Sequence, residues 1–334
     1  MKRSSEDILQ SINPIKSVEK YNKTWQQFVE YGEINDESEP TEEKFLQYFD
    51  HLRNVKHLAS STLWSVYSML NHKYQLLYGL KLQKYPRITM LLKSYEAGYQ
   101  RKVASSFTKE EIKRYLETSP NTNEHLYMKA ACVLCYFGGL RCADLASINT
   151  SDVEFNDVTG LWVSYKVSKQ KGEQINNKFN IPIEYCDYLD RYDNKLHDCN
   201  ASEGRLMKSY RIHKDGGGYF MKQPMGIHLL AKIPTKIAEF LRLKNAASYT
   251  GHAFRRTAAT VLAESATSTS SMKKHFNWKQ ENTALKYVDN TNSSKLGISK
   301  SMRLSETSSK TEEKNETVTK SLNLENCQNI VINF

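Results

Sequence analysis

The chain has 334 residues, enough for about two domains, and its 39% of hydrophobic and 11% of aromatic residues exclude wholesale disorder. No apolar run approaches the roughly 18 residues of a membrane span, and the first seven residues form no apolar signal core, so we expect a soluble intracellular protein without a membrane partner. The net charge of +10 lies within the first 300 residues and suits a polyanionic partner.

Helical periodicity dominates the first hundred residues. Apolar side chains recur at the helical spacing in four segments, which are 17–31, the segment opened by Pro40-Thr41, 61–79 and 88–100. Gly32 follows the first segment as a stop signal. We expect these helices to form a first, helical domain over residues 1–103.

Basic residues gather at the end of this predicted domain. Between Asn71 and Lys102 the one acidic residue is Glu96, and the cations are interleaved with tyrosines. The cations are Lys73, Lys81, Lys84, Arg87, Lys93, Arg101 and Lys102, and the tyrosines are Tyr74, Tyr78, Tyr85, Tyr95 and Tyr99. Cations for phosphates and phenols as donors predict a surface that contacts a nucleic-acid backbone. A solvated helix face with its tyrosines in the core is the alternative.

The second predicted domain begins near Ser106. Thr108 and Glu111 have the spacing of a capping box, and an apolar helical segment, 126–137, ends at Gly138-Gly139. Cys132 and Cys135 lie in this segment, and we interpret them as small core residues. The six cysteines lack the paired spacing of a zinc site or a disulfide framework, so the sequence indicates no metal site.

A β-hairpin is predicted next. Segments 161–168 and 178–183 are rich in β-branched and aromatic residues, and they flank a polar, basic turn. The stretch 187–226 is interpreted as loops. Its Asp215-Gly-Gly-Gly218 lacks the Gly-Lys-Ser or Gly-Lys-Thr ending of a phosphate-binding loop and predicts a surface turn. Helices are expected again at 234–243, 252–264, 268–276 and 281–287.

The predicted fold class is therefore mainly α with a small antiparallel β-sheet. The second domain is expected to span residues 104–299. Residues 300–334 are rich in Ser, Thr, Lys and Glu, so we expect a disordered tail. The tail ends in the short apolar segment 329–334.

Four motifs in the second domain carry chemistry. They are Gly138-Gly-Leu-Arg141-x-x-Asp144, the basic hairpin, His252-x-x-Arg255, and Trp278 nine residues before Tyr287. A tyrosine can exchange one phosphodiester for another and so conserve the bond energy for rejoining. Two guanidiniums can hold the charge that accumulates on the non-bridging oxygens, and a histidine can exchange protons. The set predicts attack on a DNA phosphate by Tyr287.

These motifs resemble the catalytic boxes of the tyrosine recombinase family, and the helical first hundred residues resemble its N-terminal core-binding domain. The resemblance covers roughly residues 15–295, and the Lys286-Tyr-Val-Asp289 ending is similar to recombinases of Crypton-type mobile elements. It implies a site-specific DNA recombinase or integrase that works through a 3′-phosphotyrosyl intermediate without a cofactor. The implied partner is double-stranded DNA, bound by a homo-tetramer that is a monomer or weak oligomer without DNA, and the implied location is the nucleus.

The resemblance also assigns roles to single residues. The implied catalytic residues are Arg141, His252, Arg255, Tyr287 and, where many members have a histidine, Trp278. The leaving 5′-hydroxyl takes its proton from a hairpin lysine, for which Lys169 is favoured over Lys171. Asp144 replaces the commoner glutamate and is expected to orient Arg141 from the same helix face. Arg256 stands where the family often has a histidine and is expected to contact a phosphate.

Two other functions stay open at this point. A domesticated DNA-binding protein would keep the two-domain clamp and the basic charge but would have lost strand cleavage. A type IB topoisomerase shares the tyrosine chemistry, and it would relax supercoils with one subunit and without a preferred site. The catalytic residues are all present in the sequence, which favours the recombinase.

Overall fold

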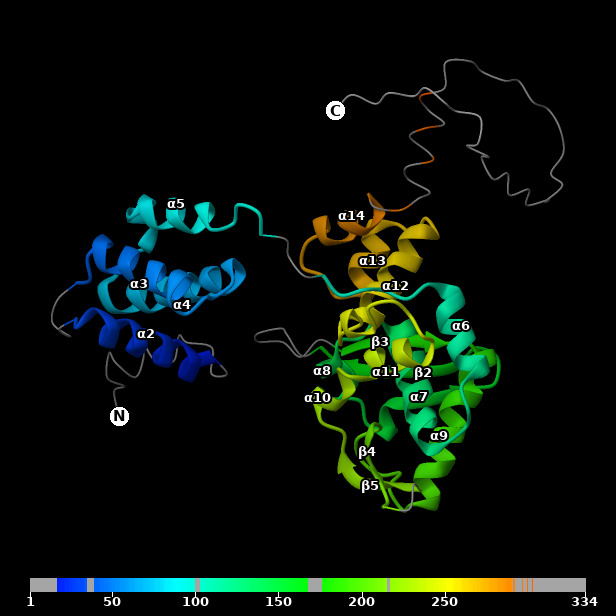
Figure 1. The fold of residues 1–334 in the computed structure, drawn as a ribbon. Coiled ribbons are helices and arrows are strands. Elements are labelled where there is room, and N and C mark those ends of the chain that lie inside the picture. Colours follow the sequence, from blue (N-terminus) through cyan, green and yellow to red (C-terminus); the bar gives the residue numbers. More distant parts are fainter. Residues whose placement is uncertain are drawn as a thin grey trace, which may run out of the picture. The chain divides into compact units, whose positions relative to one another are not determined.

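The computed structural model of the chain describes residues 17–34, 39–99, 103–167, 176–214 and 217–289, together with positions 291, 296, 299 and 302. The chain divides into two compact units, unit 1 (Met1–Val103) and unit 2 (Ala104–Phe334). Helices dominate both units, and the strands of unit 2 form small antiparallel sheets, which confirms the predicted fold class (Figure 1). No helix in the described ranges is long and apolar enough to cross a membrane.

In the described part of unit 1, four helices surround an aromatic core. They are α2 (Val18–Gly32), α3 (Glu42–Asn54), α4 (Ser60–Tyr78) and α5 (Pro86–Ser94). Phe28 of α2 stacks on Phe45 of α3 with ring centroids 4.4 Å apart. The fourth helix ends six residues before its predicted end. The chain turns after Tyr95, and Gly98 has a φ of 74°, which a helix does not accommodate.

Unit 2 is built around α7, which packs against α9, α12 and strand β3 (Figure 1). Its helices are α6 (Lys109–Thr118), α7 (Asn123–Gly138), α8 (Cys142–Leu145), α9 (Cys186–Asp198), α10 (Ile227–Leu230), α11 (Ile233–Phe240), α12 (Ala253–Glu264), α13 (Thr269–His275) and α14 (Asn282–Val288). Cys132 and Cys135 are both buried in α7, which confirms that they are core residues. Thr108 and Glu111 form the predicted capping box at the start of α6.

Two antiparallel sheets complete unit 2. The larger has the order β1 (Val153–Asn156), β2 (Gly160–Lys166) and β3 (Asn176–Ile181), and the smaller pairs β4 (Lys208–Ile212) with β5 (Gly218–Pro224). Strands β2 and β3 are the predicted hairpin, with Tyr165 opposite Asn177 in its register. The sequence did not predict β1, because its four residues alternate too briefly to give a periodic signal.

The prediction of loops over 187–226 is wrong. Helix α9 and the β4–β5 hairpin occupy most of this stretch. In α9 the buried residues Leu189, Tyr192 and Leu196 keep the helical spacing, but charged residues outnumber them and hide the pattern. The expected surface turn falls between β4 and β5, where residues 215 and 216 lie outside the described residues. The expected disordered tail, 300–334, also lies outside them apart from position 302.

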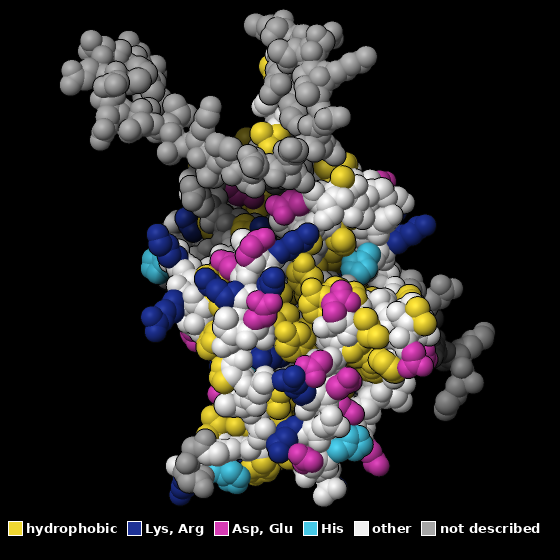
Figure 2. Space-filling view, turned by 90° about the vertical axis from the view of Figure 1, so that its right-hand side faces the viewer, with side chains coloured by type: hydrophobic (Ala, Val, Ile, Leu, Met, Phe, Trp, Pro, Cys, Tyr) yellow, Lys and Arg dark blue, Asp and Glu magenta, His cyan; other side chains and the backbone are white. Residues whose placement is uncertain are grey.

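The side of unit 2 that carries α6 faces the viewer in Figure 2. Hydrophobic side chains gather there between acidic and basic ones. A groove of about 620 Å³ lies on α6, α7 and α9, and its lining includes Leu116, Tyr136 and Tyr188 as well as Lys113 and Glu117. The charges visible on this face are of both signs. It is therefore not a uniformly positive surface of the kind that attracts a polyanion.

Candidate active site

Arg141 is placed by the turn that follows α7. Gly139 has a φ of 54°, and a Cβ at this position would lie 2.2 Å from Cε1 of Phe276. The turn therefore requires glycine. It leads directly to Arg141, which stands at the N-cap of α8 with a side chain that is 19% exposed. The guanidinium is thus anchored at the domain surface with access to an external ligand.

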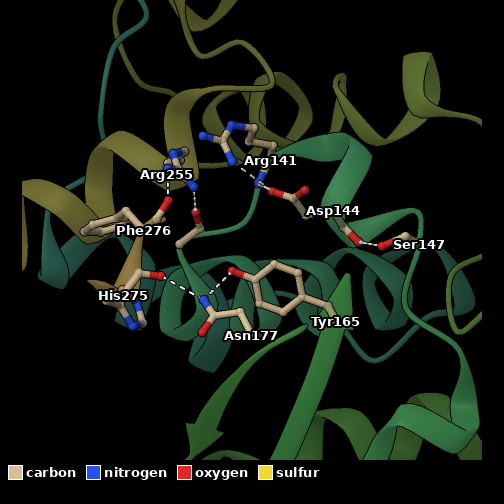
Figure 3. A network of polar contacts seen from close by, with 9 residues as sticks. Arg141, Asp144, Ser147, Tyr165, Asn177, Arg255, His275 and Phe276 are labelled. Atoms are coloured by element: carbon tan, nitrogen blue, oxygen red, sulfur yellow. Dashed lines mark hydrogen bonds and ion pairs between the residues drawn. The ribbon is translucent and has the colours of Figure 1, made fainter. Parts of the chain in front are cut away.

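Asp144 holds Arg141 through two contacts. Its Oδ2 accepts the backbone N–H of Arg141 at 3.1 Å and lies 3.4 Å from Nη1 of the guanidinium (Figure 3). The aspartate is fully buried. The sequence predicted that the two residues share a helix face, and this detail is wrong because Arg141 precedes α8 and Asp144 lies in its first turn. The carboxylate therefore orients the arginine from a helix cap.

Arg255 lies on α12 and joins three segments of the chain. Its Nη1 donates to the carbonyl of Gly139 and its Nη2 to the carbonyl of Phe276, both at 2.6 Å. The side chain is buried, with 7% of the residue exposed. A planar guanidinium suits this arrangement because its two η nitrogens point in fixed, separate directions. Among the described residues, these hydrogen bonds use two of its five N–H groups.

The charges of the two arginines act on one another. Burial first, and then the positive charge of Arg141, lower the pKa of Arg255; Tyr165, Asp144 and Tyr287 act in the opposite direction, and the pKa is about 10. Arg255 therefore stays charged at neutral pH. Two like charges held within interaction range favour an anion between them, which makes this place a candidate anion site.

The nine-residue spacing between Trp278 and Tyr287 gives an aromatic stack. Helix α13 ends at His275 and is closed by Asn277, whose φ is 50°, and the N–H of Trp278 donates to the carbonyl of Lys273 at 3.0 Å. The chain then turns through α14, and the rings of Trp278 and Tyr287 lie 5.6 Å apart and nearly parallel, at 6°. The ring of Phe276 also stacks on Trp278, and the two ring centroids lie 4.5 Å apart.

The aromatic stack reaches the buried arginine. The guanidinium carbon of Arg255 is 5.1 Å from the ring centroid of Phe276 and 5.8 Å from that of Trp278. A cation at these distances is attracted to the ring electrons. Tyr287, Trp278, Arg255 and Arg141 thus form one continuous group, as the order of motifs predicts.

A cavity of about 520 Å³ lies beside Tyr287, lined also by Arg256, Thr260, Thr283, Lys286 and Thr291. The Nε of Arg256 is buried and has no hydrogen-bond partner among the described residues. A cavity lined by Arg256, Lys286 and hydroxyl groups is suited to an anion. The structure therefore places Arg256 next to the tyrosine.

The sequence pattern of the phage integrase family matches residues 105–294, more than half of the chain. The chain belongs to the phage integrase family. This confirms the resemblance to tyrosine recombinases that the motifs indicate.

Solved structures share the fold of this phage integrase family member. It is similar to the Tn1549 transposon integrase in complex with circular intermediate DNA, with a TM-score of 0.60 and 14% identity over 88% of this chain and 98% of that chain. It is also similar to a lambda integrase dimer bound to a COC′ core site, with a TM-score of 0.51 and 15% identity over 86% of this chain and 94% of that chain. At these identities the likeness concerns the fold. None of the curated proteins compared with the chain matches it.

The implied histidine lies at the start of α12, and the implied hairpin lysine is not among the described residues. His252 stands at the N-cap of α12, one turn before Arg255, with an exposed side chain. Its carbonyl accepts the N–H of Arg256 at 3.0 Å. Lys169 and Lys171 lie outside the described residues, so the choice between them stays a prediction from sequence.

One polar network beside the arginines was not predicted from sequence. Asn177 of β3 donates to the hydroxyl of Tyr165 and to the carbonyl of His275 (Figure 3). An asparagine in a strand carries no motif, and the carbonyl that it contacts has no sequence signature. The half-buried position of His275 and its lowered pKa, caused mainly by burial, are those of a neutral histidine.

The seven cations predicted to contact a nucleic-acid backbone fall into three groups. Lys73 donates to Asn22 at 2.9 Å, Lys84 forms an ion pair with Glu39, and Arg87 lies 3.6 Å from Glu42. Lys81 and Lys93 are exposed, and their side chains form no hydrogen bond or ion pair with the described residues. Arg101 and Lys102 lie outside the described residues.

The tyrosines between these cations serve the interior of unit 1. Tyr74 is buried and donates to Glu39, and Tyr95 donates to Asp50 at 2.9 Å. Tyr78 and Tyr85 pack against the core. The predicted use of Tyr74, Tyr85 and Tyr95 as phosphate donors is therefore wrong, because their hydroxyls donate internally, to Glu39, Pro40 and Asp50. Tyr99 is the exposed member of the predicted set.

Proposed function

We propose that this phage integrase family member is a site-specific DNA recombinase that breaks and rejoins strands through a 3′-phosphotyrosyl intermediate. The observation that carries the proposal is the stack of Tyr287 on Trp278 beside the guanidiniums of Arg255 and Arg141. A nucleophile, a neutral N–H donor and two permanent cations in one place are the groups that phosphoryl transfer requires.

In the cleavage step, the Tyr287 oxygen bonds to the scissile phosphorus while the bond from phosphorus to the 5′ oxygen breaks. The phenol gives its proton to a base, for which His252 is the candidate, and the 5′ oxygen takes a proton from Lys169 or Lys171. In the joining step, the 5′-hydroxyl of a partner strand attacks the phosphotyrosyl ester and restores the phenol. One phosphodiester replaces another in each step, so the reaction needs no external energy source.

The arginines stabilise the charge that builds up on the non-bridging oxygens. Arg141 approaches from a helix cap and is oriented by Asp144, while Arg255 is held by two carbonyls and keeps further N–H groups for the phosphate. Trp278 adds an indole N–H donor and no proton transfer. Arg256, beside Tyr287, is the candidate for a contact to a neighbouring phosphate.

Double-stranded DNA is the proposed partner. The basic charge of the chain supports it, as does the presence of DNA in the Tn1549 and lambda integrase structures. Of the seven cations predicted to contact phosphates, Lys81 and Lys93 are exposed and are candidates for this role. A homo-tetramer on DNA, a nuclear location and an origin in a Crypton-type mobile element belong to the same proposal.

The nucleophile is tested with a pool of nicked duplexes whose central sequence is randomised. In such substrates a short strand with a 5′-hydroxyl diffuses away after cleavage, so the protein stays covalently attached to the 3′ phosphate. We expect an adduct that survives denaturing electrophoresis with the wild-type chain and with Tyr219→Phe, a control on β5. Tyr287→Phe should give none, because it lacks the attacking oxygen. An adduct with Tyr287→Phe would refute the assignment.

The same nicked duplexes distinguish a recombinase from the other two candidate functions. A non-catalytic DNA-binding protein would bind the duplexes with a steep salt dependence and form no adduct. A type IB topoisomerase would form adducts without sequence preference and would relax a supercoiled plasmid. Recovery of one enriched sequence in the adducts, followed by strand exchange between two copies of it, is the result that the recombinase proposal predicts.

A further inference from the structure

Asn177 is bonded on every side of its amide group. The Nδ2 donates to the hydroxyl of Tyr165 at 2.9 Å and to the carbonyl of His275 at 3.1 Å, and Oδ1 accepts the N–H of Lys178 at 3.0 Å. A carbonyl can only accept and a backbone N–H can only donate, so these partners fix which amide atom is nitrogen. The residue therefore has one orientation, set by the β2–β3 hairpin and by the end of α13.

The carbonyl that Asn177 holds is next to one that Arg255 holds. His275 accepts from Asn177, and the following residue, Phe276, accepts from Nη2 of Arg255 at 2.6 Å (Figure 3). Two successive peptide units are thus fixed from two different elements. The ring of Phe276 then stacks on Trp278, which stacks on Tyr287. A shift of the His275 carbonyl would therefore move the adjacent Phe276 carbonyl, to which Arg255 donates.

We propose that Asn177 is a positioning residue for the transfer step, which holds the 275–276 backbone so that Arg255 faces the scissile phosphate. This inference rests on the proposed function. Tyr165 supports the amide from the neighbouring strand, and it is buried, with 4% of the residue exposed. The hairpin thereby influences the position of Arg255 through Asn177 and Tyr165, independently of the hairpin lysine.

The test compares two isosteric changes on the same strand. Asn177→Asp keeps the acceptor for Lys178 but replaces both N–H donors with an oxygen that repels the His275 carbonyl. Asn180→Asp is the matched control, because the amide of Asn180 also donates to two oxygens, the carbonyls of Thr159 at 2.8 Å and Leu161 at 3.2 Å. Both changes remove two N–H donors, but those of Asn180 serve only the sheet.

Single-turnover cleavage is measured on the sequence recovered with the wild-type chain. We expect Asn177→Asp to cleave on the order of 10- to 100-fold more slowly at saturating protein, with DNA affinity within about twofold of wild type. Asn180→Asp should cleave at the wild-type rate. Wild-type cleavage by Asn177→Asp, or an equal loss in both variants, would overturn the proposal.

A substrate with sulfur in the bridging 5′ position separates the two sides of the reaction. A thiolate leaves without being protonated, whereas the arginines still act on the non-bridging oxygens. The loss in Asn177→Asp should therefore persist on this substrate. Recovery to the wild-type rate would overturn the proposal, because it would place the defect in leaving-group protonation.

A second variant covers the case in which Asn177→Asp does not fold. Tyr165→Phe removes one partner of the amide and leaves the His275 contact, so we expect a several-fold slower cleavage that the sulfur substrate does not restore. A wild-type rate for this variant would overturn the inference. If the wild-type chain itself forms no adduct, the proposed function fails; if it does and these variants match it, the inference about Asn177 fails alone.

Discussion

Replacement of Arg255 by lysine should weaken the fold as well as the reaction. Arg255 donates to the carbonyls of Gly139 and Phe276 at 2.6 Å, and a single lysine ammonium cannot reach both with the geometry of a guanidinium. Loss of one such bond to a charged donor costs about 2 kcal/mol, since the buried carbonyl is left without its partner. For a unit of this size, that free energy corresponds to a fall in melting temperature of about 4 to 8 °C.

Arg141→Lys is the matched control for this prediction. The guanidinium of Arg141 is partly exposed and has one weak contact, 3.4 Å from Asp144, so its replacement should cost less than about 1 kcal/mol. Both variants should lose cleavage by on the order of 100-fold or more. Calorimetry of the full chain, with single-turnover cleavage, separates the effects. Equal melting temperatures for the two variants would refute the structural role given to Arg255.

Three further changes test other parts of the site. Gly139→Ala places a Cβ against the Phe276 ring at a positive φ, and should destabilise the chain by about 2 to 4 kcal/mol in urea unfolding; unchanged stability would contradict the turn geometry. His275 has a lowered pKa because of burial, so the unfolded chain binds its proton first and stability should fall as pH drops below about 6.5. His275→Gln should reduce this fall between pH 7.5 and 5, and an identical slope would count against it. Trp278→Phe keeps an aromatic ring but loses the N–H, so cleavage should fall by about tenfold while the melting temperature changes little; equal cleavage would remove the donor role.

Local patterns predicted the parts of the site that depend on side-chain identity and spacing. The capping box of Thr108 and Glu111 uses atoms three residues apart, and the interval from Trp278 to Tyr287 is bridged by one turn and one helix. Both features depend on residues close together in the sequence, so sequence patterns can predict them. The helix that starts after His252 is predicted for the same reason, to within one residue.

The parts that were missed depend on partners far along the chain. Arg255 was predicted as a phosphate ligand, but its bonds to carbonyls 116 and 21 residues away have no sequence signal. The hydroxyl of Tyr74 is satisfied by Glu39, so a tyrosine among lysines turned out to be internal. Helix α9 was missed because its apolar positions are sparse, and only packing against α7 shows why they matter.

The bonds of Arg255 to two backbone carbonyls affect how relatives of this chain should be read. A relative without strand cleavage would still gain stability from Arg255, whereas the partly exposed guanidinium of Arg141 contributes little, through a 3.4 Å contact with Asp144. Retention of Arg255 alone is therefore weak evidence of an active enzyme. Loss of Tyr287 or Arg141 would be the better sign that a relative no longer cleaves DNA.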